Sequence, residues 1–187
     1  MGSVRRPTGA KALILVAIIV SSVVFLFILM GYLTVVSLSI PLRLGLVVPL
    51  RALGMVMLSV GLILFGWLFR YRSPVEIVSS TYVTFSKAWK RTPLEETAGR
   101  TENLEFQGPY GYVRHPLYLG IVILLLGWWL LLDYNFSAFA TAFLFLWLNS
   151  VVAPLEEREL VAIFREQYKQ YQDDVPKIIP FTKRRRS

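Results

Sequence analysis

The amino-acid sequence predicts an all-α integral membrane protein with about four transmembrane helices, a cytoplasmic loop and a C-terminal amphipathic helix. Of its 187 residues, 55% are hydrophobic and 17% are charged, whereas roughly a quarter of a typical soluble domain is charged. Long apolar runs alternate with polar blocks, which is the pattern of membrane spans. The length is that of one domain and no internal repeat is evident, so we expect residues 1–187 to form a single membrane domain.

Two apolar runs between residues 12 and 69 predict the N-terminal spans. The first extends from about Ala12 to Ser37 and the second from about Leu50 to Phe69, with Pro41 and Pro49 breaking the chain before the second. A cleaved signal peptide is the alternative for the first run. Its apolar stretch is longer than the roughly 7–15 residues of a signal-peptide core, which favours a span.

The C-terminal part, residues 117–187, is predicted to form a helical hairpin followed by a cytoplasmic helix. Apolar runs at Leu117–Leu132 and Phe136–Val152 are separated only by Asp133-Tyr134-Asn135, which predicts a tight turn. Each run is slightly short for a hydrocarbon core of about 30 Å, which suggests local thinning of the bilayer or tucked helix ends. The polar segment at 154–187 then supplies the amphipathic helix.

The distribution of basic residues predicts the orientation. Of twenty Lys and Arg residues, only Arg43 and Arg51 fall on the side shared by the first loop and the Asp133 turn. The other eighteen lie in the N-terminus, the 70–116 loop and the C-terminal segment, which the positive-inside rule assigns to the cytoplasm. Eleven of the twelve acidic residues lie there too. We therefore expect any active site to face the cytoplasm.

The composition excludes several classes of site. There is no cysteine, which removes disulfides, thiolate nucleophiles and cysteine-based zinc sites. His115 is the single histidine, so a multi-histidine metal centre is impossible and no metal site is predicted. The net charge of +8 is more typical of basic residues facing anionic lipid than of nucleic-acid binding, and no nucleic-acid motif is present. The expected partners are membrane lipids and a lipophilic substrate.

The 70–116 loop ends in the most distinctive motif of the sequence. A short helix is expected near Val75–Trp89, followed by a loop that leads into Gly108–Tyr118, GPYGYVRHPLY. This motif places Arg114 and His115 just before a span, and Pro116 suits the first turn of its helix. The free N–H groups and positive dipole end of that helix would suit an anionic group such as a carboxylate. An interfacial anchor, with tyrosines in the headgroup region and Arg114 touching lipid, is an equally good interpretation.

An acidic pair follows the last span. On a helix, Glu156 shares a face with Leu160, Phe164 and Tyr168, and a carboxylate on that packed face requires a partner. The alternative is that Glu156 and Glu157 merely favour the positive end of their helix. The remaining charged residues of this segment are expected to point outward into water: Arg158, Glu159, Arg165 and Glu166.

The predicted hairpin connects these two features. Both of its ends are cytoplasmic, so it would bring His115 and Glu156 to the same membrane surface at the bases of adjacent helices. An amphipathic helix beside them could cover a pocket that opens sideways to lipid. A ligand that carries both an amine and a carboxylate would find complementary groups at the two ends of such a pocket.

These residues resemble a known superfamily. GPY at 108–110 and RHPLYLG at 114–120, followed by Glu156-Glu157 and spaced Leu160, Phe164, Tyr168, Tyr171, Val175-Pro176 and Ile179-Pro180, are similar to the isoprenylcysteine carboxyl methyltransferase and phospholipid methyltransferase superfamily. The resemblance covers about residues 100–181. The RHPxY motif and the acidic pair are specific in combination, and the first two spans match only in being hydrophobic.

The resemblance implies that S-adenosylmethionine binds between the loop, the hairpin and the C-terminal helix. The residues that match the family's cofactor site are a strand-like segment of Glu102, Asn103, Leu104 and Glu105, then Tyr110, His115, Pro116, Leu117 and Tyr118, and finally Glu156. The string at 102–108 also resembles a viral protease recognition site with Glu105 in place of its tyrosine, and that origin stays open. For catalysis, Glu157 or His115 could assist loss of a proton from an amine acceptor, and Arg114 is the candidate cation for an acceptor carboxylate.

Two departures from the family pattern bear on the substrate. Isoprenylcysteine enzymes carry a substrate-binding arginine four residues before the cofactor-binding glutamate, where this chain has Val152. Arg165 replaces the glycine that usually precedes the final Glu-x-Tyr. We therefore expect methyl transfer to a lipophilic, membrane-embedded acceptor, with a lipid-borne amine or uncharged lipophile favoured over prenylcysteine. An NADPH-dependent sterol-type reductase relative and a non-catalytic membrane protein that keeps the fold are the alternatives.

Overall fold

The computed structural model describes residues 10–73 and 106–182, and the regular elements of this part of the chain are all helices or helical turns. Its elements are α1 (Ala10–Ser37), α2 (Val48–Leu68), the 3₁₀ turn η1 (Gly108–Gly111), α4 (Pro116–Leu132), α5 (Asn135–Trp147), the π-helical turn η2 (Leu148–Val152) and α6 (Ala153–Asp174). The all-α prediction is confirmed for these residues. The helix expected near Val75–Trp89 lies outside the described residues.

Helix lengths agree with a membrane protein. Two stretches in the described ranges are long and apolar enough to cross a bilayer, Val48–Leu68 and Asn135–Asp174, and Ser21–Ser37 and Pro116–Leu132 are shorter apolar helices. The apolar side chains on α1 and α2 include many that are largely exposed, such as Ile63 at 70%. Such exposed apolar surface is favourable against lipid and unfavourable against water.

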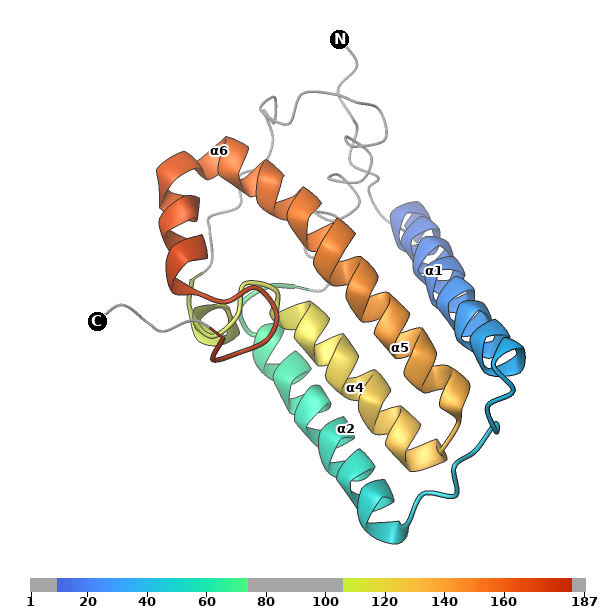
Figure 1. Cartoon of the computed structure of the whole chain (residues 1–187). Coiled ribbons are helices and arrows are strands. Elements are labelled where there is room, and N and C mark those ends of the chain that lie inside the picture. Colours follow the sequence, from blue (N-terminus) through green and yellow to red (C-terminus); the bar gives the residue numbers. More distant parts are fainter. Residues whose placement is uncertain (1–9, 74–105, 183–187) are drawn as a thin grey trace.

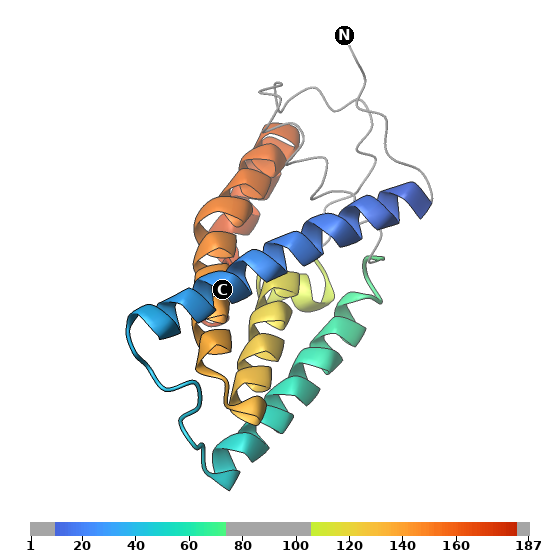
Figure 2. The ribbon, with the colours of Figure 1, turned by 90° about the vertical axis from the view of Figure 1, so that its right-hand side faces the viewer.

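The helices pack in the order α1, α5, α4, α2, which differs from their order in the chain. Contacts join α1 to α5, α5 to α4 and α4 to α2. Figure 1 shows α2, α4 and α5 side by side, and Figure 2 shows α1 crossing α5 obliquely. The segment 38–47 therefore passes beneath the hairpin of α4 and α5 to connect α1 with α2.

Glycines allow the helix backbones to approach closely. A Cβ atom on Gly54 would lie 2.8 Å from the carbonyl oxygen of Gly127, and one on Gly127 would lie 2.9 Å from that of Gly54. On α1, a Cβ atom on Gly31 would lie 2.2 Å from the carbonyl oxygen of Phe136. Small residues are favoured at helix contacts in membranes because lipid tails are as apolar as the side chains, so tight packing must supply the stabilisation.

The turn between α4 and α5 is built around Asp133. This residue ends α4 with φ at 62°, and its buried carboxylate accepts hydrogen bonds from the N–H groups of Leu44, Gly45 and Leu46 at 3.1, 2.7 and 2.9 Å. Burial raises the pKa of Asp133, but these backbone hydrogen bonds outweigh it and the pKa lies below its usual value. The 38–47 segment is thus fastened to the hairpin at the end opposite the acidic pair.

The helix of the fourth predicted span continues beyond the span's predicted end. At Val152 the chain passes from α5 and η2 directly into α6, so residues 135–174 are helical up to and beyond a kink at Arg165. Arg165 interrupts α6 with φ 47° and ψ −123°, and the helix turns back there (Figure 1). The chain that follows α6, residues 175–180, which we call the C-terminal segment, passes beside the N-terminus of α4.

Candidate functional site

The dipeptide Arg114-His115 lies between η1 and α4 and is held by the C-terminal segment. The Arg114 N–H donates to the carbonyl oxygen of Pro176 at 2.9 Å, and the His115 N–H donates to that of Lys177 at 3.0 Å. His115 caps α4, and Pro116 occupies the first turn, as the sequence predicted. The backbone therefore fixes both side chains at the base of the α4–α5 hairpin.

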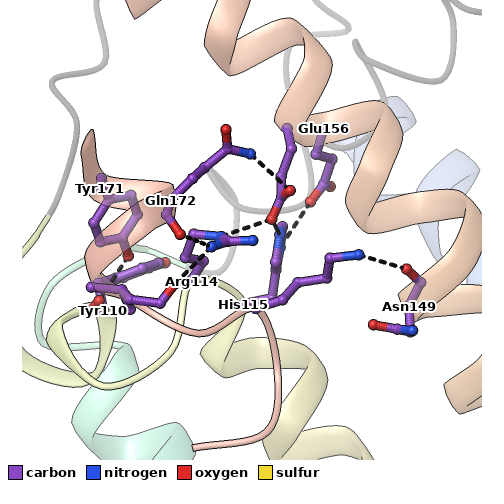
Figure 3. Close-up of polar contacts among 10 residues, drawn as sticks. Tyr110, Arg114, His115, Asn149, Glu156, Tyr171 and Gln172 are labelled. Atoms are coloured by element: carbon purple, nitrogen blue, oxygen red, sulfur yellow. Dashed lines mark hydrogen bonds and ion pairs between the residues drawn. The ribbon is translucent and has the colours of Figure 1, made fainter. Parts of the chain in front are cut away.

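The Arg114 guanidinium connects three parts of the C-terminal region. Its Nε donates to Oε1 of Glu157 at 2.9 Å, and its Nη1 donates to the carbonyl oxygens of Gln172 and Val175 at 2.7 and 2.6 Å (Figure 3). The side chain is only 7% exposed. A charge-assisted contact with a carboxylate and two carbonyl contacts give this cation a fixed position between the two ends of α6.

The imidazole of His115 lies between the two carboxylates of the acidic pair. Its Nδ1 is 3.5 Å from Oε2 of Glu156, and its Nε2 is 3.1 Å from Oε1 of Glu157 (Figure 3). Burial lowers the pKa of His115, but the hydrogen bonds and charges of both glutamates outweigh it and raise the pKa above its usual value. The arrangement favours an imidazolium that donates from both nitrogens.

The two glutamates differ in their surroundings. Glu157 is buried, contacts Arg114 and His115 through one oxygen, and accepts a hydrogen bond from Nε2 of Gln172 at 2.9 Å through the other. Burial raises the pKa of Glu157, but the His115 hydrogen bond and the Arg114 charge lower it more, to about 2. Glu156 is partly exposed beside the other imidazole nitrogen. Glu157 is therefore an ionised, fully engaged carboxylate, and Glu156 is the more accessible of the two.

Two tyrosines of the GPYGYVRHPLY motif lie beside the cluster: Tyr118 contacts His115, and Tyr110 contacts α6. The ring of Tyr118 is buried and stacks on His115, with ring centres 5.1 Å apart and an interplanar angle of 3°. The carbonyl oxygen of Tyr110 accepts a hydrogen bond from the hydroxyl of Tyr171 at 2.7 Å, which holds η1 against α6. Leu117 is half-buried against the apolar core of the hairpin.

The structure thus brings Arg114, His115, Tyr118, Glu156 and Glu157 together. The predicted cofactor residues at 102–105 lie outside the described residues. Groups that sequence reasoning did not assign to the site also take part: Gln172 binds Glu157, and the C-terminal segment pairs with the motif. Helical periodicity could not predict the contact between Glu157 and Gln172, because the kink at Arg165 lies within the 15 residues that separate them.

One expectation about the acidic helix is wrong. Glu159 was expected to face water, but its side chain is fully buried, whereas Arg158, Arg165 and Glu166 are exposed as expected. Glu157 and Glu159 are two residues apart and therefore about 200° apart around a helix. The expectation assumed a single buried face, and the burial of both residues shows that α6 is covered on two sides at this level.

The family comparison matches a range that contains Arg114, His115 and the acidic pair. A family model described as phospholipid methyltransferase matches residues 53–167. The chain is 36% identical over 85 residues to methanethiol S-methyltransferase of Crocosphaera subtropica, covering 42% of this chain and 30% of that protein. It is 43% identical over 74 residues to protein-S-isoprenylcysteine O-methyltransferase of Schizosaccharomyces pombe, covering 39% and 31%. The chain therefore matches about a third of the length of these relatives, and no solved structure matches it.

Proposed function

The chain belongs to the phospholipid methyltransferase family, and on this premise we propose that it is an S-adenosylmethionine-dependent methyltransferase acting on a lipophilic acceptor within the membrane. The observation that carries the proposal is the buried cluster of Arg114, His115 and the acidic pair at one end of the α4–α5 hairpin. It is a polar site at the base of apolar helices, where a membrane-dissolved acceptor and a water-soluble donor can meet.

The proposal includes a topology. We take α1, α2, α4 and α5 as four spans, with both termini, residues 70–116 and α6 in the cytoplasm. The eighteen-to-two distribution of basic residues supports this orientation. Asp133 ends α4 and binds the 44–46 segment, so in this topology the turn and the first loop lie together on the side opposite the cytoplasm. The cluster then faces the cytoplasm.

The cofactor site that we propose uses His115 and Glu156 for the amino-acid moiety of S-adenosylmethionine or its neighbouring ribose. The residues present fit such a ligand, because the accessible carboxylate of Glu156 suits an ammonium or a hydroxyl, and a shift of Glu156 toward that group would free Nδ1 of the imidazolium for the ligand carboxylate. Aromatic faces such as those of Tyr110 and Tyr118 suit a sulfonium by cation–π contact. When bound, the cofactor would supply an activated methyl group. By family resemblance, Pro116, Leu117 and residues 102–105 would complete the site.

The surroundings of Glu157 and His115 determine whether either can act as a general base. Glu157 has a pKa of about 2 and three partners, and His115 favours the imidazolium form, so neither is a strong base in this arrangement. We therefore propose that Arg114 and Glu157 mainly position His115. Proton removal by Glu157 or His115 stays a prediction for acceptors that must lose one. The site is best suited to an acceptor that reaches it with a free lone pair.

The acceptor that we propose is a lipid-borne amine or an uncharged lipophile. Val152, which stands where isoprenylcysteine enzymes have an arginine, is 2% exposed and packs among apolar residues such as Leu148 and Ile178. Drawing a carboxylate into that environment without a cation would cost several kcal/mol. Methanethiol and isoprenylcysteine, which the names of the relatives contain, are the comparison substrates.

One binding assay separates this proposal from its alternatives. Purified protein should retain labelled S-adenosylmethionine and not NADPH, and His115→Ala should weaken retention, whereas the exposed-site variant Lys169→Ala should not. Retention of NADPH alone would indicate the sterol-type reductase relative. Retention of neither would indicate a membrane protein that keeps the fold without catalysis.

A further inference from the structure

Lys177 connects the C-terminal segment to the junction of α5 and α6. Its main-chain carbonyl oxygen accepts the His115 N–H at 3.0 Å, which places the residue directly beside the cluster. From there its Nζ donates to the carbonyl oxygen of Asn149 in η2 at 3.1 Å (Figure 3). The side chain is half-buried. One lysine therefore spans the distance between the proposed cofactor residues and the helix that carries Val152.

The π-helical turn explains why a carbonyl is available at Asn149. In an α-helix the N–H of Ala153 would bind this carbonyl oxygen, but here it binds that of Leu148, five residues back. The next residue that could donate is at position 154, and Pro154 has no N–H. Neither helical donor reaches the Asn149 carbonyl, and the Lys177 ammonium takes their place. Turns of this kind are frequent at functional sites.

Among the described residues, Arg114 forms an ion pair with a carboxylate, whereas Lys177 contacts a neutral carbonyl. Arg114 contacts a carboxylate and two carbonyl oxygens. In contrast, the ion pairs within the described ranges include none with Lys177, whose side chain contacts a neutral carbonyl. An ammonium has three N–H donors, so this contact leaves donors and a full charge available for a further acceptor. A neutral donor would have been enough to bind the carbonyl.

We propose that Lys177 binds the phosphodiester of the methyl acceptor; this rests on the proposed function. Lysine binds such groups as a point charge. The Asn149 carbonyl that the ammonium binds belongs to the same turn, η2, as Val152. A lipid-borne amine carries a phosphodiester close to its amino group, so this inference agrees with the acceptor class proposed above and adds a charge requirement to it.

The test measures preference for an anionic head group without requiring turnover. The full-length protein in nonionic detergent is titrated with dodecyl phosphate, dodecanoate and dodecanol, and apparent affinities are read from the thermal unfolding midpoint. We expect the unmodified protein to prefer dodecyl phosphate to dodecanol by roughly ten- to a hundredfold, the range of a charge-assisted hydrogen bond. Dodecanoate should rank below dodecyl phosphate, and the reverse ranking would contradict the assignment to a phosphodiester. Comparing variants cancels the partitioning of each probe into micelles.

Three variants make the result decisive. Lys177→Gln removes the charge but keeps a neutral donor for the Asn149 carbonyl, so it should abolish the preference, whereas Lys177→Arg should keep most of it. Lys169→Gln is the matched control, because this exposed lysine pairs with Glu166 away from the cluster. The affinity for S-adenosylhomocysteine, measured separately, should be unchanged in Lys177→Gln.

Several outcomes would overturn the inference. An unmodified protein without anion preference, or a Lys177→Gln variant that keeps it, would show that the ammonium does not bind the probe. Loss of S-adenosylhomocysteine affinity in Lys177→Gln would assign the ammonium to the cofactor carboxylate instead. A Lys177→Gln variant that fails to fold would show that the ammonium serves only to bind the Asn149 carbonyl oxygen. If the unmodified protein binds no S-adenosylhomocysteine, the proposed function fails, while the amphiphile titration still reports on Lys177.

Discussion

Replacing Glu157 with glutamine tests whether the buried cluster stabilises the protein through charge. The carboxylate has a pKa of about 2 instead of the ordinary 4.5. At about 1.4 kcal/mol per pKa unit, this shift corresponds to about 3 kcal/mol of stabilisation at neutral pH. Removing one partner of a buried ion pair costs about 3–5 kcal/mol, because the other charge is left uncompensated. Glu157→Gln should therefore lower the free energy of unfolding by about 3 kcal/mol.

The same shift predicts how stability depends on pH. Because the folded pKa of Glu157 is lowered, its contribution is complete above about pH 5 and is lost as the pH falls toward 2. His115 acts in the opposite direction. Its pKa is raised, so its contribution is complete below its ordinary value of 6.5 and is lost as the pH rises through the folded pKa. The cluster should stabilise the fold most between about pH 5 and 6.5.

Unfolding of purified protein in a mild detergent, followed across pH 3 to 8, provides the measurement. Glu157→Gln should lose most of the acid-limb dependence that the unmodified protein shows between pH 5 and 3. Glu166→Gln is the matched control. Its carboxylate is exposed and paired only with Lys169, so a change of no more than about 1 kcal/mol is expected. An unchanged acid limb in Glu157→Gln, or equal effects of the two variants, would refute the electrostatic reasoning.

Four further predictions concern the cofactor, the topology, the acceptor and the helix contacts. His115→Ala or Glu156→Ala should weaken S-adenosylmethionine affinity by roughly ten- to a hundredfold, since each removes a charge-assisted hydrogen bond of about 1.5–3 kcal/mol; unchanged calorimetric affinity in both folded variants would reject the assignment. A single cysteine at position 95 should react with a membrane-impermeant reagent from the cytoplasmic side, and labelling only from the outside would reverse the orientation. N-acetyl-farnesylcysteine should be a poorer methyl acceptor than phosphatidylethanolamine because of Val152, and efficient turnover of the prenylcysteine would contradict this. Gly127→Val should destabilise the α2–α4 contact, since even a Cβ atom there would lie 2.9 Å from a backbone oxygen, and an unchanged unfolding midpoint would show that the helices can separate freely.

The sequence was sufficient for the features that depend on local patterns. Apolar runs predicted the bounds of α1, α2 and α4 to within about two residues, because an apolar helix is recognised by its own length and hydrophobicity. Pro116 predicted the start of α4. The RHPLY motif and the acidic pair carry the resemblance to the family, which the comparisons confirm.

The tertiary structure decided what depends on residues far apart in the chain. No periodicity indicates that Asp133 binds three N–H groups of the 44–46 segment, or that Arg114 binds Glu157 forty-three residues later. The burial of Glu159 escaped the sequence reasoning because it depends on which segments cover α6. The sequence gives no reason to distinguish Lys177 from a surface lysine. Only the structure shows that it binds the Asn149 carbonyl, which the π-helical turn and Pro154 leave without a helical donor. Local patterns fix which residues form helices, but hydrogen bonds between distant segments exist only once packing has brought those segments together.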